Sequence, residues 1–227
     1  MAYIGIDTET ANSYVMEDGE VILKDSLVYD VGWKVMTNKG KTIFNRSYVV
    51  SEIFNDPDMM ASAYYADKIP KYLEDIQSGK RKVKSILTIY KKFRSDCKRY
   101  KVKAIFAHNA LFDYRALNNT LRFLTGSEIR YFYPYGIELW DTLKMSREAI
   151  GRTKEYTAFC DENGFKTKHK KPQNRLTAEV LYRYISGNVD FEESHTGLED
   201  VEIETQIMFF CLKQDKEVKR RLFEDRE

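Results

Sequence analysis

The chain has 227 residues, a length that favours one sizeable hydrophobic core and is short for two domains. Its formal net charge is +2 at pH 7, so any basic surface must be local, and bulk charge neither supports nor excludes a nucleic-acid partner. No apolar run approaches the roughly 18 residues of a membrane span, and we expect neither a signal peptide nor a membrane contact. Cys97, Cys160 and Cys211 form no metal-site pattern and indicate free thiols in a reducing cytoplasm.

The first ten residues, MAYIGIDTET, predict a short buried strand over 3–7 that ends at two carboxylates. Its apolar residues are β-branched or aromatic, as buried strands favour. Side chains two positions apart share a face of a strand, so Asp7 and Glu9 are expected on one face and Thr8 on the other. Two anions this close repel each other away from water, which favours a divalent Mg²⁺ or Mn²⁺ between them. The alternative is an ordinary strand end with solvated acids.

Turn signals at 18–19 and 38–40 separate β-rich runs in the next part of the chain. We expect strands over 28–35 and 42–50, which with the first strand make an antiparallel start to a sheet. A small extra hairpin over 12–24 is expected beside the two carboxylates.

The periodicity then becomes helical, with apolar residues three to four positions apart over 59–76 and 85–100. The basic run QSGKRK, over 77–82, separates these two helices and is typical of a solvated turn. The apolar segment 102–107 follows the second helix and predicts a buried strand in a parallel arrangement. HNALFD, over 108–113, leads into another helix.

Short elements and one further basic loop fill the rest of the chain. In chain order we expect a strand over 131–139, helices over 143–150 and 154–162, the basic loop 166–175, a helix over 176–185, a last helix that starts at HTGLED and runs to 210, and a solvated helix end over 213–227. No internal repeat or linker interrupts this order, so one domain is expected.

Three polar patches fall at predicted ends of strands and starts of helices, where mixed α/β proteins place their ligand sites. They are Asp7 with Glu9, Asn109 with Asp113, and His195 with Asp200. Four carboxylates and a histidine match the needs of phosphodiester hydrolysis, in which two divalent ions act with a neutral base. Histidine suits the base because its unperturbed pKa lies near the working pH.

In these patches the sequence resembles the DnaQ-like 3′–5′ exonucleases of the DEDDh type. The three family motifs are matched in order by IGIDTET, HNALFD and HTGLED, and the resemblance spans Tyr3 to Phe210. Tyrosine-type relatives carry a Tyr four residues before the last Asp. Here that position is Thr196, so the histidine subtype fits.

The resemblance implies an α/β, ribonuclease-H-like fold: a mixed sheet with its first three strands antiparallel and the later ones parallel, flanked by helices. It implies a single exonuclease domain over 1–227, with insertions near 11–27 and 164–175. The implied activity is metal-dependent 3′–5′ hydrolysis at single-stranded DNA or RNA 3′ ends, releasing nucleoside 5′-monophosphates. The residues implied for catalysis are Asp7, Glu9, Asp113 and Asp200 as ligands of two Mg²⁺ or Mn²⁺ ions, and His195 as general base.

Substrate contacts are expected at positions near these motifs. Relatives hold the terminal nucleotide just after the first motif, here at Thr10, Ala11 and Asn12. Asn109 either fixes its turn or contacts the substrate. Among the basic runs, Lys168, Lys170 and Lys171, and residues 77–82 with them, either contact phosphates or form solvated loops.

Several structural roles stay open beside the catalytic ones. His108 is expected to make a structural hydrogen bond, and Asp141 to cap the following helix. His195 could itself cap the last helix instead of acting as a base. The chain as a whole could be another ribonuclease-H-like nuclease, such as an endonuclease, or a non-catalytic nucleic-acid-binding module. An endonuclease gives no reason for His195 just before Asp200, and a binding module has no need for the complete set of acids.

Overall fold

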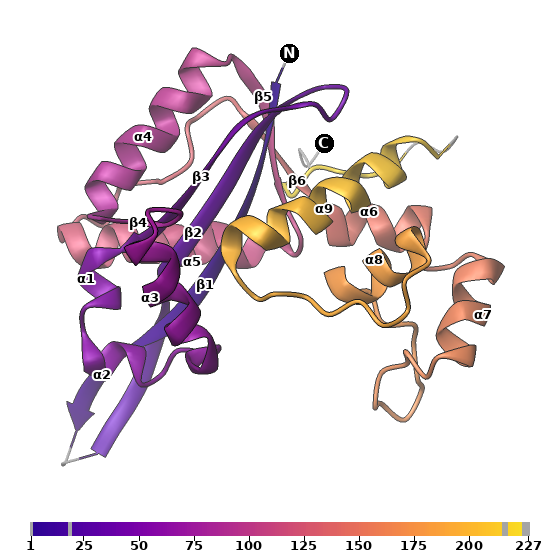
Figure 1. Ribbon diagram of the computed structural model, residues 1–227, viewed down its shortest axis with the longest axis horizontal. Helices are drawn as coiled ribbons and strands as arrows, with labels where there is room; N and C mark the ends of the chain where they lie inside the picture. The colour runs from indigo at the N-terminus through magenta and orange to yellow at the C-terminus, as the bar shows by residue number, and fades with distance from the viewer. Residues whose placement is uncertain (1, 18–19, 215–217, 224–227) are drawn as a thin grey trace.

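A computed structural model, which describes residues 2–17, 20–214 and 218–223, is organised around a six-stranded sheet in the order β4-β3-β2-β1-β5-β6 (Figure 1). The strands are β1 Ala2–Glu17, β2 Glu20–Thr37, β3 Thr42–Val50, β4 Lys82–Lys84, β5 Val102–Ala107 and β6 Glu138–Asp141. Strands β1, β2 and β3 pair antiparallel, whereas β4, β5 and β6 each pair parallel to a neighbour. The expected mixed sheet, antiparallel first and parallel later, is confirmed.

The helices divide into two groups, and Figure 1 shows α6 to α9 on one side of the sheet and α1 to α4 on the other. Their bounds are α1 Ser51–Phe54, α2 Pro57–Met60, the 3₁₀ turn η1 Ala66–Lys68, α3 Ile69–Gln77, α4 Ile86–Arg99, α5 Ala110–Thr125, α6 Thr142–Ala149, α7 Lys154–Glu162, α8 Ala178–Ser186 and α9 Gly197–Leu212. One hydrophobic cluster joins α4 and α5 to one face of the sheet, and a second joins α6 to α9 to the other. Burial of these two apolar faces is the main stabilising contribution.

Two glycines bring the start of α9 against the sheet. A Cβ built on Gly32 of β2 would lie 2.2 Å from the backbone nitrogen of Leu198. A Cβ on Gly197 would lie 2.9 Å from the carbonyl oxygen of Asp7 and from the backbone nitrogen of Gly32. Only residues without a side chain allow this approach, so the first turn of α9 sits directly over β1 and β2.

The prediction of one continuous helix over 59–76 is wrong. The chain instead forms α2, a 3₁₀ turn and α3, and a further short helix, α1, precedes them. Proline explains the breaks, because it lacks the N–H of the helix interior and is tolerated only in the first turn. Pro57 begins α2, where Asp56 caps the helix, and Pro70 stands in the first turn of α3.

The strand expected over 131–139 is also misplaced, since β6 begins only at Glu138. Pro134 and Gly136, whose φ is +81°, break the extended pattern before it. The expected helical end over 213–227 is wrong where the structure describes it. Residues 218–223 run beside β6, with hydrogen bonds from Asp141 N to Arg220 O (2.9 Å) and from Leu222 N to Leu139 O (2.7 Å).

The expected small hairpin over 12–24 continues the first two strands rather than forming a separate element. Strands β1 and β2 form one long ladder, with register shifts at Glu9/Thr10 and at Asn12/Tyr14. Its turn at 18–19 lies outside the described residues. The described helices include none long and apolar enough to cross a membrane.

Candidate active site

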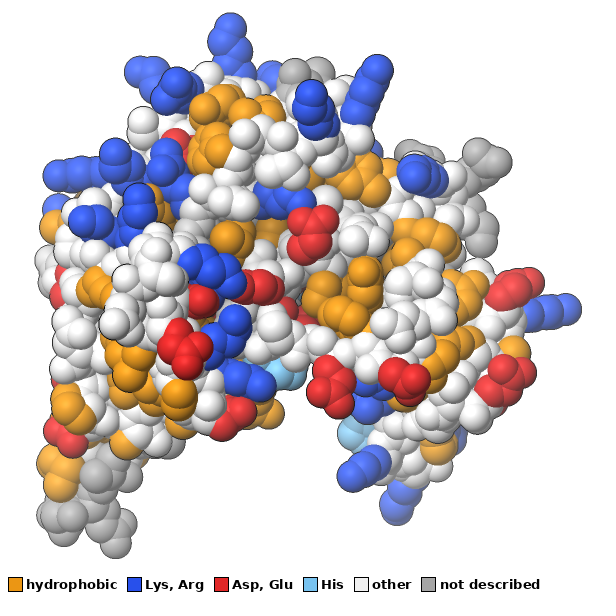
Figure 2. Space-filling view, in the orientation of Figure 1, with side chains coloured by type: hydrophobic (Ala, Val, Ile, Leu, Met, Phe, Trp, Pro, Cys, Tyr) orange, Lys and Arg blue, Asp and Glu red, His pale blue; other side chains and the backbone are white. Residues whose placement is uncertain are grey.

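The motif carboxylates of β1 and α9 meet in a cavity of about 590 Å³. Figure 2 shows the molecule hollowed between its two groups of helices. One carboxylate oxygen each of Asp7, Glu9 and Asp200 lie within 4.8 Å of one another there. Among the described residues, these three acids form the group that could hold a metal ion. Asp7 and Glu9 share a face of β1 as the alternation predicts, and Gly32 opposite Asp7 leaves room for α9 above them.

Asp113, in the first turn of α5, also lines the cavity, but it is not part of the group within 4.8 Å. Its Oδ1 accepts a hydrogen bond of 2.8 Å from the hydroxyl of Thr8. Thr8 lies between Asp7 and Glu9 on the strand and thus ties α5 to β1. The structure therefore brings three of the four motif carboxylates together and holds the fourth beside them.

Asp200 is held by the segment that precedes α9. Its Oδ2 accepts a hydrogen bond from the backbone N–H of Thr196 (2.9 Å), and its Oδ1 accepts one from the hydroxyl of Ser194 (3.1 Å). These two contacts lie on either side of His195. The carboxylate and the loop that carries the histidine therefore form one hydrogen-bonded unit.

Burial in the cavity and mutual repulsion disfavour the charged forms of its carboxyl groups. Burial, followed by repulsion from Asp200 and other acids, raises the pKa of Glu9 to about 9. Burial and the charge of Glu193 raise the pKa of Asp200 to about 8 despite its hydrogen bonds, and burial raises that of Asp113 to about 7. Hard carboxylate oxygens that lack a cation of the chain are the donor set that Mg²⁺ and Mn²⁺ prefer, so the residues present fit a divalent ion.

A fifth acid, Glu204, was not singled out from the sequence. It lies one helical turn after Asp200 on α9, is buried, and lines the same cavity. Its Oε1 accepts a hydrogen bond from the backbone N–H of His108 (2.8 Å), while its Oε2 has no hydrogen-bond partner among the described residues. The spacing of four residues from Asp200 was a usable signal, because such residues share a helix face.

His195 also faces the cavity, with a left-handed backbone conformation (φ +53°) that is uncommon for a residue with a side chain. Its ring stacks on Tyr65, with centroids 4.1 Å apart and 8° between the planes. Thr196, not His195, is the N-cap residue of α9. Burial lowers the pKa of His195 below its usual 6.5, so the imidazole is neutral at pH 7.

Gly197 at the start of α9 is buried and tightly packed, so it does not make the loop before the helix mobile. The missing side chain allows the backbone of Gly197 to approach Asp7 and Gly32 closely. The loop before α9 is therefore anchored on its carboxyl side.

The residues around the second motif have structural contacts. His108 lies within hydrogen-bond distance of the Thr142 hydroxyl (Nδ1, 3.0 Å) and of the Leu176 carbonyl (Nε2, 2.7 Å). Asp141 accepts hydrogen bonds from two N–H groups at the start of α6 and from that of Asn109. Asn109 has a left-handed backbone and shapes the turn into α5, while its exposed side chain lines the cavity.

The three positions after the first motif, at which substrate contacts were expected, are engaged within the chain. The carbonyl of Thr10 accepts a hydrogen bond from Tyr64 N (3.3 Å), Ala11 is buried, and Asn12 N donates to Ser62 Oγ (2.8 Å). The cavity wall is formed by other described residues, with none of these three among them.

The basic loop 166–175 borders the cavity through other residues than its lysines. Lys168, Lys170 and Lys171 are exposed and do not belong to the described lining. Arg175 from the same loop and Arg147 from α6 do line the cavity. Arg175 ends the basic loop in which phosphate contacts were expected, whereas Arg147 stands in no motif or basic run and was not expected.

The other basic run, 77–82, is exposed except at Arg81. Arg81 is 1% exposed and forms an ion pair with Asp30, while Lys80 pairs with Glu199 at 2.6 Å. Burial in the ion pair with Asp30 excludes Arg81 from a phosphate contact, whereas such a contact at the exposed Lys80 stays a prediction.

Comparison with known proteins gives matches in structure only, since no protein-family model and no curated protein matches the sequence. The nuclease domain of 3′hExo, a DEDDh family member bound to rAMP, has a TM-score of 0.60 at 11% identity, and the match covers 97% of this chain and 96% of that one. For exonuclease I in its apo form the TM-score is 0.56 at 11% identity, and the match covers 94% of this chain and 42% of that one. For the zinc-bound complex of E. coli ExoI with ssDNA the TM-score is 0.50 at 13% identity, and the match covers 93% of this chain and 40% of that one. The chain thus has the fold of DEDDh exonuclease domains, as the three motifs predict.

Proposed function

We propose that residues 1–227 form one exonuclease domain that hydrolyses single-stranded DNA or RNA from the 3′ end and releases nucleoside 5′-monophosphates. The observation that carries this proposal is the convergence of Asp7, Glu9 and Asp200 within 4.8 Å in a cavity that His195 also lines. The likeness in fold to the 3′hExo nuclease domain supports it. The free, buried cysteines fit the cytoplasmic location that we propose.

In this proposal Asp7, Glu9 and Asp200 hold divalent Mg²⁺ or Mn²⁺, with Asp113 as the fourth ligand residue of a two-ion site. Bound ions of this kind supply a stronger nucleophile and stabilise charge on the leaving oxygen. The chain itself contributes the orientation of the ligands. Ser194 and Thr196 fix both oxygens of Asp200, and Thr8 fixes one of Asp113.

We propose His195 as the general base of the reaction. Its imidazole is neutral at pH 7 and can accept the proton that the attacking water loses. The left-handed backbone at His195 directs the ring over the cavity and against Tyr65. Arg147 and Arg175 are placed to neutralise phosphates of the bound strand.

The direct test is hydrolysis of 5′-labelled single-stranded DNA and RNA oligonucleotides with Mg²⁺ or Mn²⁺. A 3′–5′ exonuclease shortens the labelled strand stepwise from its far end and yields mononucleotides. Asp7→Asn is the matched control, since it removes a ligand charge from a folded chain. Cleavage of circular single strands would show an endonuclease, and binding without any cleavage would show a nucleic-acid-binding module.

A further inference from the structure

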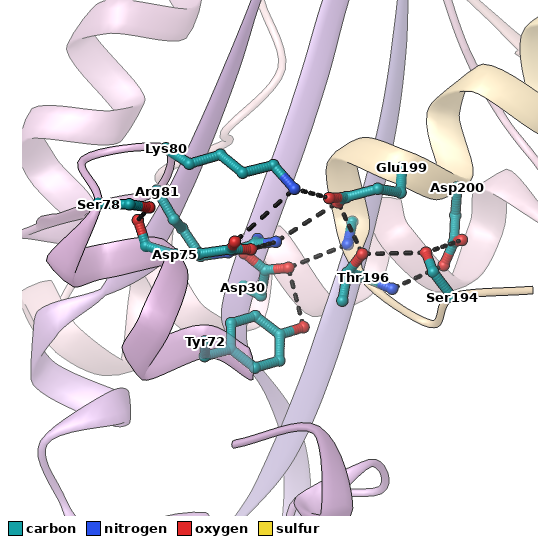
Figure 3. Close-up of polar contacts among 11 residues, drawn as sticks. Asp30, Tyr72, Asp75, Ser78, Lys80, Arg81, Ser194, Thr196, Glu199 and Asp200 are labelled. Carbon is teal, nitrogen blue, oxygen red and sulfur yellow. Dashed lines mark hydrogen bonds and ion pairs between the residues drawn. The ribbon is translucent and has the colours of Figure 1, made fainter. Parts of the chain in front are cut away.

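A buried ion pair lies beside the candidate active site, as Figure 3 shows. Asp30 of β2 stands directly opposite Glu9 in the ladder of β1 and β2, and it is fully buried. Both of its oxygens are occupied by other groups of the chain. Oδ1 pairs with Arg81, and Oδ2 accepts hydrogen bonds from the Tyr72 hydroxyl (3.0 Å) and from the backbone N–H of Gly197 (2.9 Å). Asp30 is therefore an anchor rather than a member of the carboxylate cluster.

The contact with Gly197 caps α9 from a distant part of the chain. The first N–H groups of a helix have no partner within the helix and need an acceptor. Thr196, the N-cap residue, makes no side-chain cap, and its hydroxyl donates instead to Glu199 at 2.6 Å. The acceptor comes instead from Asp30, 167 residues earlier in the sequence. The place of the α9 start over the sheet thus depends on Asp30.

Arg81 is the cationic partner of the anchor. Its guanidinium lies over the ring of Tyr72, 4.5 Å from the centroid, and its Nη2 reaches Asp75 at 3.4 Å and Glu199 at 3.5 Å. Glu199 belongs to the first turn of α9 and also binds Lys80. Arg81 therefore ties the turn after α3 to both β2 and α9. A buried charge without such a partner is strongly unfavourable.

We propose that Asp30 is a positioning residue for the hydrolysis proposed above, on which this inference rests. Gly197 is fixed to Asp30, and the neighbouring Thr196 and Ser194 are fixed to Asp200. His195 lies within this short segment. The hydrogen bond from Gly197 to Asp30 thus places the base and one ligand carboxylate relative to the carboxylates of β1.

The test distinguishes the effect of the hydrogen bond between Gly197 and Asp30 from the effect of losing the ion pair between Asp30 and Arg81. Arg81→Met removes the buried cation, and in that background Asp30→Asn keeps an acceptor for Gly197, whereas Asp30→Leu has none. Both double variants are neutral at the two positions, and in both of them Asp75 and Glu199, which also lose Arg81, keep Lys80 as a partner. We expect the Asn variant to keep kcat within about 3-fold of wild type and the Leu variant to lose roughly 10–100-fold, with KM little changed in both.

Affinity for Mn²⁺, measured by calorimetry, is the readout that does not need turnover. We expect it to be roughly 10-fold weaker in the Leu variant than in the Asn variant, because Asp200 shifts when Gly197 is released. The control is the ion pair of Arg46 with Asp96 on β3 and α4, which among the described residues shares no hydrogen bond or ion pair with α9. Arg46→Met with Asp96→Asn and Arg46→Met with Asp96→Leu should have equal kcat and equal Mn²⁺ affinity.

If neither double variant at 30 and 81 folds, Tyr72→Phe tests the same anchor, because it removes one hydroxyl from Asp30. We expect it to lower kcat about 3-fold at unchanged KM. Equal kcat in the Asn and Leu variants, or an unchanged kcat in Tyr72→Phe, would overturn the positioning role. A wild-type protein that cleaves none of the substrates would instead reject the proposed function, and Mn²⁺ affinity would then decide the role of Asp30 alone.

Discussion

The ring of Tyr65 lies face to face with the imidazole of His195, with centroids 4.1 Å apart and 8° between the planes. The two residues come from segments far apart in the sequence, Tyr65 from the turn before η1 and His195 from the loop before α9. A stacked pair of this kind restricts rotation of the imidazole. Since the backbone at His195 is held in an uncommon conformation, ring and backbone together fix where its nitrogen atoms point.

Removal of this stack should lower turnover. Tyr65→Ala is expected to reduce kcat by about 3–10-fold, because an aromatic pair contributes about 0.5–1.5 kcal/mol to the placement of the base. Tyr65→Phe keeps the ring and should stay within about 2-fold of wild type. Tyr135→Ala is the matched control for loss of a tyrosine, since Tyr135 is fully exposed and lines a different pocket. A Tyr65→Ala protein with wild-type kcat would show that the stack does not serve catalysis.

Loss of the imidazole itself should have a larger effect. His195→Ala is expected to lower kcat by roughly 10²–10⁴-fold, the contribution of a general base. The melting temperature should change little, because Thr196 and not His195 occupies the N-cap position of α9. A histidine that served only the helix would give the opposite result, with reduced stability and retained turnover.

The pH dependence of the unmutated protein follows from the same residue. A base works in its neutral form, and burial keeps the pKa of His195 below 6.5. At saturating metal, kcat should therefore be constant from pH 8 down to about 6.5 and fall only below that value. A fall that begins above pH 7 would point to a different titrating group.

Local sequence was sufficient to find the carboxylates that converge. Asp7 and Glu9 follow an apolar run at the start of β1, and Asp200 stands in the first turn of α9, so patterns of neighbouring residues mark each position. The antiparallel start of the sheet and its later parallel strands also follow from turn signals and from the alternation of strands with helices. These features depend on neighbours in the sequence, which is why sequence analysis recovers them.

Contacts between distant elements had no such signature. Arg81 stands in the run QSGKRK, which is typical of a solvated turn, yet it is buried because Asp30, Asp75 and Glu199 surround it from other elements. Glu204 follows other acids on α9, and although its spacing from Asp200 was a usable signal, only the folded chain shows that it is buried and lines the cavity. The role of a charged residue in a helix or a basic run thus depends on partners from other elements, which the sequence alone does not identify.

Metal should stabilise the chain more at high pH than at low pH. In unfolded chains carboxyl groups have pKa values near 4, but in the folded chain those of Asp113, Asp200 and Glu9 are raised to about 7, 8 and 9. The folded metal-free chain therefore binds more protons than the unfolded chain between about pH 4 and 9, and its free energy of unfolding falls as pH rises. Divalent ions replace these protons.

We accordingly expect the rise in melting temperature on adding Mg²⁺ or Mn²⁺ to be larger at pH 8 than at pH 6, and EDTA to reverse it. Calorimetry in two buffers with different ionisation enthalpies should show that protons are released on binding. Asp7→Asn, which removes one ligand charge, should reduce both effects. An equal thermal shift at the two pH values would mean that the metal does not bind these acids.

The last prediction concerns the two groups of cations near the cavity. Arg147 and Arg175 line it, whereas Lys168, Lys170 and Lys171 lie on the exposed part of the neighbouring loop. A very short oligonucleotide fills only the cavity, while a longer strand also reaches the loop. Arg147→Ala and Arg175→Ala should therefore weaken the binding of both lengths, and replacement of the three lysines by Ala should weaken only that of the longer strand.

Salt dependence provides the quantitative measure of these interactions. For a single strand, each cation that no longer neutralises a phosphate should lower the slope of log affinity against log salt by about 0.7. Fluorescence anisotropy with Asp7→Asn protein, over a series of NaCl concentrations, gives this slope without cleavage of the probe. An unchanged slope for the lysine variant on long strands would identify 166–175 as a solvated loop. An unchanged slope for the two arginine variants would remove Arg147 and Arg175 from the path of the phosphate backbone.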